Sequence, residues 1–235
     1  MQFSVIIPVY NEERSLRILQ EGLFRVMEGI SSQYEIIYVD DGSTDSSLEV
    51  LKDLARNYST VKIISLKENK GQSTALYVGL KSSQGEWMVT LDADGQNPPE
   101  EIIRLLEFQN GFDFITGIRV KNKHCFIKRV ASFTARFFRR LILADITKDA
   151  GCSLKIFKRE IVDFLPFFNH FHRFFTFFAR QAGFNVKEVY VAHHKRIFGR
   201  SKYGISRRLR QGLFDLIGVY WLKKRLIHYE VRNKF

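Results

Sequence analysis

Short, continuous apolar segments alternate with longer amphipathic stretches through the first half of the chain. Four apolar segments, rich in Val and Ile, lie at residues 3–9, 34–39, 61–66 and 87–91. Continuous apolar segments of this length are typical of strands that are buried on both faces of a parallel sheet. We therefore expect four parallel strands in this part of the chain.

Helix-like stretches separate the predicted strands. One spans residues 12–29, a second follows Asp45 and a third starts near Gly71. A fourth begins at Pro98-Pro99-Glu100-Glu101, because proline and acidic residues suit the first turn of a helix. The β-α-β-α order with short connections predicts a right-handed, mostly parallel, three-layer α/β fold.

Polar residues follow each predicted strand. They are Pro8-Val9-Tyr10-Asn11-Glu12-Glu13, Asp40-Asp41-Gly42-Ser43-Thr44-Asp45, Asn69-Lys70-Gly71-Gln72 and Asp92-Ala93-Asp94-Gly95-Gln96-Asn97. Any one of these segments could be an ordinary turn or helix cap. Four of them at one edge of one sheet predict a ligand site, because open α/β sheets bind ligands beyond the carboxyl ends of their strands.

Asp92 and Asp94 form the sharpest pair in these segments. In a strand their side chains would share one face, and two carboxylates this close repel each other unless a cation or a proton lies between them. Oxygen ligands of this kind suit Mg²⁺ or Mn²⁺. A calcium loop is excluded because Asn97 and Ile103 occupy the positions where it needs Gly and Glu. A dinucleotide fingerprint and a P-loop are also absent from the sequence.

The charge of the chain is unevenly distributed. Residues 1–118 contain 10 Lys and Arg against 18 Asp and Glu, whereas residues 119–235 contain 27 against 7. An acidic half can hold a cation, and a basic half can meet an anionic partner. Charge alone leaves nucleic acid, an anionic lipid surface and phosphorylated substrates open as that partner.

The motifs of the first 120 residues resemble the donor site of family 2 inverting glycosyltransferases, which have the GT-A (Rossmann-like) fold. The resemblance implies a nucleotide-sugar donor, with Pro8, Tyr10, Glu12 and Asp40 at the base and ribose. It also implies that Asp92, Asp94 or both carry a metal that bridges the donor diphosphate. The full set of expected donor-binding residues is Pro8, Tyr10, Asn11, Glu12, Asp40, Lys70, Gly71, Asp92, Ala93 and Asp94.

The run from Asp92 to Glu100 is similar to the DADLQ-x-PPE motif of the polyprenyl-phosphate branch of that family. In that branch the glutamine also reaches the metal, which implies Gln96 as a third metal ligand beside Asp92 and Asp94. Gly95 stands where the branch usually has Leu. Further matches extend the resemblance to about residue 205: Gly117-Ile118-Arg119, Asp149-Ala150-Gly151-Cys152-Ser153-Leu154, His172-Arg173-Phe174 and Gly199-Arg200-Ser201-Lys202-Tyr203.

Transfer to a phosphate needs cations more than it needs a base. The second pKa of a phosphate monoester is near ~6, so the group is largely ionised at neutral pH. Arginine and lysine must then hold two anionic reactants together. With Asp92 and Asp94, the expected catalytic residues are Arg119, Arg129 and Lys202. The expected acceptor-binding residues are Arg129, Ser132, Arg200, Ser201 and Lys202.

A hydroxyl acceptor would instead need a catalytic carboxylate deeper in the chain. Asp145 and Asp149 lie in the right region, but neither belongs to an acidic pair, and Lys148 beside Asp149 argues against a raised pKa. Transfer to a hydroxyl of a glycan, protein or lipid therefore stays an alternative. A third alternative is an anion- or nucleic-acid-binding protein that has no catalytic role. The basic half contains no nucleic-acid-binding motif, and such a role would leave the carboxylate site unexplained, so we expect no nucleic-acid partner.

Two basic amphipathic helices predict contact with an anionic membrane surface. One is residues 126–141, with an apolar stripe opposite Lys and Arg side chains, and the other contains Phe214, Ile217, Tyr220 and Trp221 between basic clusters. The twelve residues between Arg210 and Lys223 would form ~18 Å of helix, too short for ~30 Å of hydrocarbon. We expect peripheral association with the cytoplasmic side of a membrane, directly, through an anchoring partner or as a homo-oligomer.

These expectations divide the chain into two regions. A GT-A domain would occupy residues 1–205, with a donor-binding half at 1–118 and an acceptor-side half at 119–205. A basic, membrane-associating tail would occupy residues 206–235. The phenylalanine-rich stretch at 164–178 could line a prenyl groove, although core packing is the commoner role for such residues.

Overall fold

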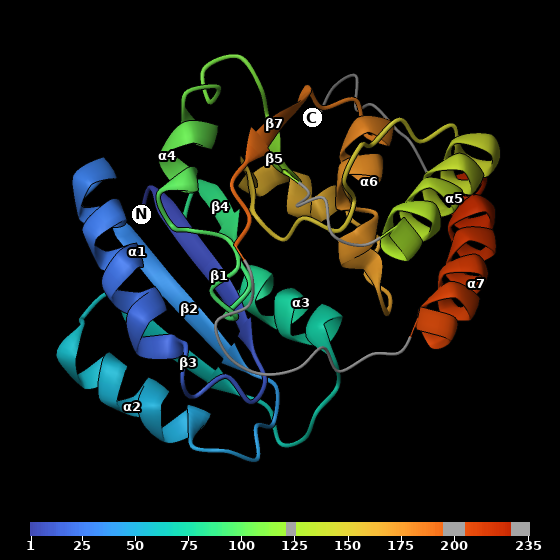
Figure 1. Ribbon diagram of the computed structural model, residues 1–235. Coiled ribbons are helices and arrows are strands. Elements are labelled where there is room, and N and C mark those ends of the chain that lie inside the picture. The colour runs from blue at the N-terminus through green and yellow to red at the C-terminus, as the bar shows by residue number, and fades with distance from the viewer. Residues whose placement is uncertain (121–125, 195–204, 227–235) are drawn as a thin grey trace, which may run out of the picture. The chain divides into compact units, whose positions relative to one another are not determined.

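The computed structural model describes residues 1–120, 126–194 and 205–226 (Figure 1). For residues 126–133, 135 and 205–211 the description is confined to the backbone. The chain divides into two compact units. The first comprises Met1–Asn122 with Lys148–Arg200, and the second comprises Lys123–Thr147 with Ser201–Phe235. Residues 123–147, expected in the acceptor-side half, thus group with the C-terminal segment.

A seven-stranded sheet forms the centre of the first unit, in the order β3-β2-β1-β4-β6-β5-β7. The strands are β1 (Phe3–Val9), β2 (Tyr34–Asp40), β3 (Val61–Ser65), β4 (Trp87–Thr90), β5 (Phe114–Arg119), β6 (Lys155–Lys158) and β7 (Val186–Val191). Of the pairings in this sheet, only those of β6 with β4 and β5 are antiparallel. The predicted mostly parallel sheet is confirmed, and the four predicted strands are β1 to β4.

Helices cover both faces of this sheet, which makes the three predicted layers. The helices of the first unit are α1 (Leu16–Ile30), α2 (Ser47–Asn57), α3 (Gln72–Ser82), α4 (Glu101–Leu106) and α6 (Phe175–Gln181), with 3₁₀ turns η1 (Arg159–Phe164) and η2 (Phe171–Arg173). Buried side chains of α1, α2 and α4 form one core with alternate residues of the strands, whereas Ala75 of α3 packs with Ile37 and Val39 on the other face. Figure 1 shows α1 and α2 on one side of the sheet and α3 on the other.

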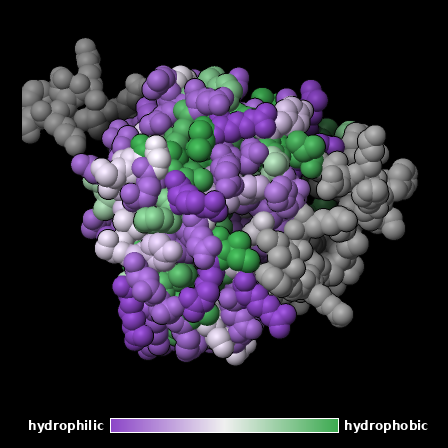
Figure 2. All heavy atoms as spheres, turned by 60° about the vertical axis from the view of Figure 1, so that its left-hand side comes forward, coloured by the Kyte–Doolittle hydropathy of each residue, from purple (hydrophilic) through white to green (hydrophobic). Residues whose placement is uncertain are grey.

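The face of the first unit that α1 and α2 form is largely hydrophilic, with hydrophobic side chains scattered over it (Figure 2). This agrees with helices whose apolar residues are turned toward the sheet. Helix α1 begins at Leu16, later than the expected residue 12. The reason is that the preceding residues form a loop: Asn11 has φ 55°, and the Glu12 N–H donates to Ser47 Oγ over 2.9 Å.

The phenylalanine-rich stretch is mainly core. Five of its phenylalanines are buried: Phe171, Phe174, Phe175, Phe177 and Phe178. The Phe175 ring contacts the Phe157 ring of β6 with centroids 5.6 Å apart, and Phe157 stacks on Phe114 of β5 at 5.3 Å. These residues therefore fill the space between the sheet and α6.

The second unit contains the helices α5 (Phe126–Leu143) and α7 (Ile205–Lys223), which lie side by side (Figure 1). Lys223 Nζ donates to the Leu143 carbonyl over 2.9 Å. Large apolar side chains are exposed on both helices: Phe137, Phe138 and Leu141 on α5, and Leu213, Phe214, Ile217, Tyr220 and Trp221 on α7. In the described part of the chain, no helix combines the length and the apolar composition needed to cross a bilayer.

One expectation for α5 needs correction. The Lys and Arg side chains expected opposite the apolar stripe of residues 126–141 include Arg139, but the Arg139 guanidinium forms an ion pair with Asp145, and the Arg139 side chain is only 12% exposed. Asp145 also accepts from the Thr147 N–H and hydroxyl. Burial would raise the pKa of Asp145, but Arg139 and Thr147 outweigh it and lower that pKa. Arg139 therefore serves to hold this turn.

Candidate active site at the carboxyl edge of the sheet

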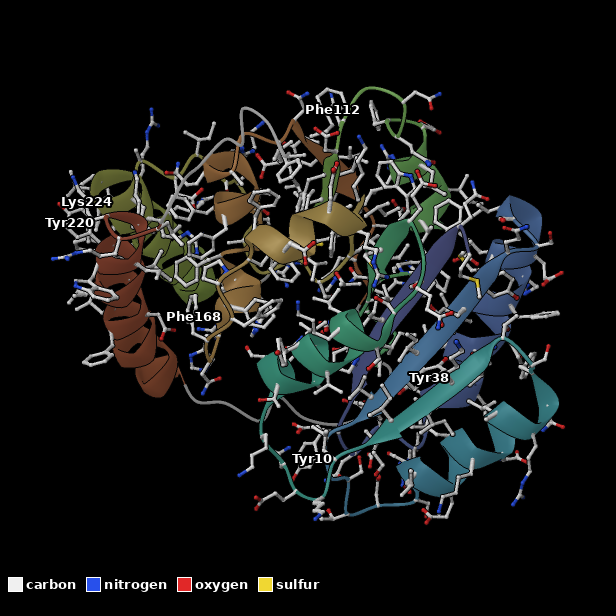
Figure 3. All side chains as sticks on the ribbon, turned by 180° about the vertical axis from the view of Figure 1, so that it is seen from behind. Tyr10, Tyr38, Phe112, Phe168, Tyr220 and Lys224 are labelled. Carbon is white, nitrogen blue, oxygen red and sulfur yellow. The ribbon has the colours of Figure 1, made fainter. Side chains whose placement is uncertain are left out.

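The loops that follow β1 and β2 are joined by direct hydrogen bonds. The Asn11 amide donates to Thr44 Oγ1 over 3.1 Å, and the Thr44 N–H returns a bond to Asn11 Oδ1 over 2.8 Å. The Asn11 N–H also donates to Ser43 Oγ over 3.0 Å. Asparagine suits this place because it tolerates the positive φ that the turn requires. Tyr10 lies just before this junction, at the end of the first strand (Figure 3).

The loop after β2 is tied to the start of α3 by Asp41. Its two carboxylate oxygens accept the N–H groups of Lys70 and Gly71 over 2.7 and 2.8 Å. Gly42 makes the approach possible: its φ is +65°, and a Cβ there would lie 2.6 Å from the backbone of Glu68. The two loops that the sequence predicted at this edge, Asp40–Asp45 and Asn69–Gln72, are thus in direct contact.

Asp40 is buried and already bonded inside the protein. Its oxygens accept the Ser43 N–H over 3.2 Å and the Ser65 hydroxyl over 3.1 Å. Burial, and to a smaller degree the charge of Asp40, raise the pKa of its neighbour Asp41. A contact between Asp40 and a nucleotide stays a prediction, and the bonds observed here give the residue a role in shaping the loop.

Asp92 and Asp94 follow β4 at the same edge. The Gln72 amide of α3 donates to Asp92 Oδ1 over 2.7 Å, and Asp94 Oδ1 accepts the Gln96 N–H over 3.1 Å in a tight turn at Gly95, which has φ +70°. Burial and the charge of Asp94 raise the pKa of Asp92 to about 6, above its ordinary value. The two carboxylates therefore interact. They do so from the turn after β4, whereas the expected shared face assumed a strand. Ala93 between them is buried.

Gln96 lies against the segment that follows β7. Its backbone carbonyl accepts the His194 N–H over 2.8 Å, and its amide nitrogen donates to the His194 carbonyl over 3.2 Å. His193 Nε2 is 3.4 Å from the same amide nitrogen, and His193 Nδ1 is 3.3 Å from Asn97 Oδ1. Burial and the nearby charge of Arg119 lower the pKa of His193, which favours a neutral imidazole.

This donor set fits a hard divalent cation. Burial and, second to it, the charge of Asp94 disfavour the ionised form of Asp92, and a cation beside the two carboxylates would favour it. In the described part of the chain, no three or more His, Cys, Asp or Glu side chains form a metal-binding group. Mg²⁺ needs no such cage, because one or two carboxylates hold it together with water and substrate phosphates. The Gln96 amide oxygen and the neutral His193 are further donors within reach of this edge.

Arg119, at the end of β5, is held rigidly by Asp149. The Arg119 N–H, Nε and Nη2 donate to the Asp149 carboxylate over 3.1, 2.8 and 2.8 Å. Burial opposes the charge of both groups, but their mutual contact lowers the pKa of Asp149 and raises that of Arg119. A guanidinium carries five N–H donors, and Asp149 takes two of them from the side chain. The remaining donors could receive an anion.

A buried lysine lies behind the carboxylate pair. Lys155 of β6 is opposite Thr90 of β4 in the sheet register, and its ammonium donates to the Cys152 carbonyl. Burial lowers the pKa of Lys155, while the nearby carboxylates of Asp92 and Asp149 act in the opposite direction. Its positive charge also partly offsets the repulsion within the aspartate pair.

Several expected site residues lie outside the described residues. They are Arg200, Ser201 and Lys202, while Arg129 and Ser132 lie on α5 with only their backbone described. The expected residues that lie at the carboxyl edge are Tyr10, Asn11, Asp40, Lys70, Gly71, Asp92, Ala93, Asp94, Gln96 and Arg119, together with Asp41, which was not among the expected donor-binding residues. Pro8 precedes the same edge within β1, and Glu12 is joined to Ser47 there.

Gln72, Lys155 and His193 also lie at this edge, although none of them is among the predicted site residues. Gln72 stood only at the end of a predicted loop. His193 reaches the site because β7 is parallel to β5, which brings the residues after β7 to the same edge of the sheet.

A mostly parallel sheet between two layers of helices, with a loop that carries two aspartates at its carboxyl edge, is the arrangement of the GT-A class of glycosyltransferases. The model of Glycosyl transferase family 2 matches residues 4–165, so this chain belongs to that family. The predicted family and fold are therefore confirmed.

Similar proteins include undecaprenyl-phosphate 4-deoxy-4-formamido-L-arabinose transferases. The one from Pectobacterium carotovorum subsp. carotovorum is 35% identical over 216 residues, which cover 91% of this chain and 66% of that protein. The one from Yersinia enterocolitica is 34% identical with the same coverage. This chain thus spans just under two thirds of the length of these relatives.

Solved structures support the fold. Glucosyl-3-phosphoglycerate synthase from Mycobacterium tuberculosis, in complex with Mn²⁺, uridine diphosphate and phosphoglyceric acid, superposes with a TM-score of 0.71 and 18% identity, covering 92% of this chain and 78% of that chain. Its complex with phosphoglyceric acid gives a TM-score of 0.70, also at 18% identity, covering 92% and 80%. At this identity the likeness shows a shared fold.

Proposed function

We propose that this chain is a glycosyltransferase that moves a sugar from a nucleotide-sugar donor to a polyprenyl phosphate. The observation that carries the proposal is the meeting of the Asp92–Asp94 pair with the loops after β1 and β2 at one edge of a GT-A sheet. The 35% identity to proteins named undecaprenyl-phosphate 4-deoxy-4-formamido-L-arabinose transferase supports the acceptor class.

The donor would lie across the carboxyl edge. In this proposal Pro8, Tyr10, Asn11 and Glu12 contact the nucleoside. The loop at Lys70 contributes the positive charge of the Lys70 side chain and the backbone of Lys70 and Gly71. The Asn11–Thr44 and Asp41–Lys70 bonds support it, because they fix these loops before any ligand arrives. A site organised in advance loses less conformational entropy on binding.

Asp92, Asp94 and Gln96 would hold Mg²⁺ or Mn²⁺, which supplies positive charge for the leaving diphosphate. Structures of M. tuberculosis glucosyl-3-phosphoglycerate synthase that share the fold contain Mn²⁺ or Mg²⁺ with uridine diphosphate, which supports this assignment. Arg119 is set beside the same carboxylates, and its unused N–H donors would contact a phosphate.

Both candidate general bases are engaged in ion pairs. Asp149 is bonded to Arg119 and Asp145 to Arg139, and both carboxylates have lowered pKa values. A group that stays ionised and paired is a weak base, whereas an acceptor phosphate is itself largely anionic. This favours a phosphate acceptor over a hydroxyl. Arg129, Ser132, Arg200, Ser201 and Lys202 stay the proposed acceptor-binding residues.

The acceptor class implies a membrane surface, which the second unit could contact. Exposed Phe214 and Trp221 on α7 and the basic residues Lys223, Lys224 and Arg225 at its end combine apolar and cationic groups. Lys224 lies over the Tyr220 ring, 5.8 Å from its centroid, near the end of α7 (Figure 3). Aromatic and basic side chains together are typical of helices at the lipid headgroup level. We infer peripheral association with the cytoplasmic side of a membrane.

A transfer assay tests the function directly. The purified chain would receive radiolabelled UDP- and GDP-sugars, Mn²⁺ and a short polyprenyl phosphate. We expect the labelled sugar to be attached to the prenyl lipid and to be released by mild acid, because a sugar phosphodiester is acid-labile. Label recovered only in an acid-stable glycoside would contradict a phosphate acceptor and favour a hydroxyl acceptor. Tight binding of duplex DNA without affinity for a nucleotide sugar would contradict the proposal that the chain is a glycosyltransferase.

A further inference from the structure

The metal-site carboxylate Asp92 has a protein partner from another element. Gln72, the first residue of α3, donates its amide N–H to Asp92 Oδ1 over 2.7 Å. A carboxylate with one oxygen engaged in this way cannot rotate freely, so the direction in which its second oxygen points is set. Groups that orient metal ligands in this manner typically change metal affinity or activity 10–100-fold when they are removed.

The turn that carries Gln72 is fixed on its N-terminal side by the loop after β2. Gly71 has φ +91°, and its N–H and that of Lys70 are held by Asp41. This contact determines where α3 begins, and hence where the Gln72 side chain leaves the helix.

The next residue, Ser73, fixes the same turn from the opposite side. Ser73 is buried, and its Oγ accepts the His170 N–H over 2.8 Å and lies 2.8 Å from His172 Nδ1. The Ser73 hydroxyl can donate to or accept from Nδ1 of a neutral imidazole, depending on the His172 tautomer. Burial lowers the pKa of His172 to about 3, so the ring is neutral. Tyr77, one turn further along α3, contacts the Phe167 ring at 4.5 Å between centroids.

We infer that Gln72 is a positioning residue for Asp92, and that the buried Ser73–His172 contact holds the helical turn from which Gln72 reaches it. The segment from Phe167 to His172 then has a second role besides packing, since it braces the donor-side metal site. This inference rests on the proposed function, because it assigns Asp92 to a divalent cation.

The test compares Mn²⁺ binding by the purified full chain and four variants. Free Mn²⁺ is followed by electron paramagnetic resonance, with no donor present. Gln72→Met keeps the length of the side chain but removes the donor, and we expect its Mn²⁺ dissociation constant to rise about ten-fold or more. Ser73→Ala should weaken binding in the same direction. Thr74→Val is the matched control, because Thr74 lies in the same turn and, among the hydrogen bonds described, its hydroxyl donates only to the Lys70 carbonyl, over 3.1 Å.

Thermal unfolding of each variant separates positioning from folding. We expect Gln72→Met and Thr74→Val to unfold at the temperature of the parent chain, so a loss of Mn²⁺ binding in the first alone supports the inference. Gln72→Met that binds Mn²⁺ as tightly as the parent chain would overturn it, as would an equal loss in Thr74→Val. If Ser73→Ala does not fold, Gln72→Met still decides the role of Gln72.

Asp94→Asn distinguishes a failure of this inference from a failure of the proposed function. If the parent chain binds Mn²⁺, Asp94→Asn does not and Gln72→Met does, only the positioning role is wrong. If Asp94→Asn binds Mn²⁺ as the parent chain does, the metal assignment is wrong and the positioning role is overturned with it.

Discussion

At the residue scale, the aspartate pair combines two demands that conflict in the free protein. Asp92 and Asp94 must both be close to one point to hold a cation, yet their proximity and burial disfavour the charged form of Asp92. Lys155 and Arg119 reduce this conflict with positive charge from β6 and β5. The free protein therefore holds the ionised Asp92 at a cost in free energy. Binding of a cation between the carboxylates would recover that free energy.

Asp94→Asn should abolish transfer and leave the fold intact. The amide oxygen of Asn can still accept the Gln96 N–H that Asp94 Oδ1 accepts at 3.1 Å, but it carries no charge for a metal. We expect a loss of activity of at least ~100-fold, beyond the usual effect of indirect partners. The unfolding temperature should change by less than ~3 °C, equivalent to under about 1 kcal/mol. Glu107→Gln, an exposed charge removal at the end of α4, is the control. Turnover retained by Asp94→Asn would refute the metal assignment.

Glu35, in β2 far from the carboxyl edge, should determine the acid stability of the fold. The Glu35 carboxylate accepts hydrogen bonds from the Ser4 hydroxyl over 2.6 Å and from the Gln84 N–H over 2.7 Å. It also forms an ion pair with Lys62 at 2.7 Å. Burial would raise the pKa of Glu35, but these three partners outweigh it and lower the pKa below 4.5. A pKa lowered by folding adds stability above the unfolded value, and that contribution is lost as the pH falls through the folded value.

Glu35→Gln should therefore lower the free energy of unfolding at pH 7 by about 1–3 kcal/mol, because the Gln84 N–H or the Ser4 hydroxyl loses a charged acceptor. The same variant should lose less further stability than the parent chain when the pH is lowered below 4.5. Urea unfolding at both pH values measures this, with exposed Glu21→Gln as the control. Equal acid sensitivity of Glu35→Gln and the parent chain would exclude the role of this carboxylate.

At the scale of elements, apolar periodicity sufficed for β1, β2 and β4, which are buried along almost their whole length. The strand predicted at residues 61–66 also exists as β3, but it lies at the sheet edge with only Val61 buried, so the expected burial on both faces is wrong for this strand. Apolar periodicity did not suffice for β6, which is four residues long and antiparallel, or for β7, which is half-exposed at the sheet edge. Their positions depend on pairing with β4 and β5, a non-local property that the local pattern does not contain.

The same distinction explains which site residues could be predicted. Asp92 and Asp94 belong to a local motif directly after a buried strand, so the sequence alone indicated that they lie at the carboxyl edge. They follow the end of β4, however, and do not alternate as strand residues do. Gln72, Lys155 and His193 reach the site from α3, β6 and the segment after β7. Their roles follow only from the order of the strands and from side-chain contacts across the sheet.

Helix α7 offers a prediction that depends on a whole face of one element. Phe214 and Trp221 are 82% and 61% exposed, so replacing both with Ser should not affect folding. If this face inserts into a membrane, burial of each ring contributes about 1.5–3 kcal/mol. We expect the double variant to bind anionic vesicles at least ~10-fold more weakly in a sedimentation assay. Ile103→Ser, an exposed apolar residue of α4, is the control. Unchanged vesicle binding by the double variant would exclude α7 as the membrane contact.

At the scale of the whole molecule, charge separates the two proposed partners. Residues 1–118, which contain Asp92 and Asp94, hold 18 of the 25 Asp and Glu residues, whereas 27 of the 37 Lys and Arg residues follow them. A donor complexed with a divalent cation meets the acidic part, while a lipid-borne phosphate in an anionic surface is attracted by the basic part. This division gives the two substrates different dependences on ionic strength.

Salt should therefore weaken vesicle binding far more than it weakens Mn²⁺ binding. The screening length falls from ~30 Å at about 0.01 M salt to ~3 Å at about 1 M, and a basic residue near an anionic surface contributes about 1 kcal/mol. We expect vesicles that contain an anionic lipid to release the chain over this range, and neutral vesicles to bind it weakly throughout. Mn²⁺ held by direct bonds to Asp92 and Asp94 should be displaced much less, because contact ligands are poorly screened. Steep salt dependence with duplex DNA but none with anionic vesicles would instead make the basic half a nucleic-acid-binding surface.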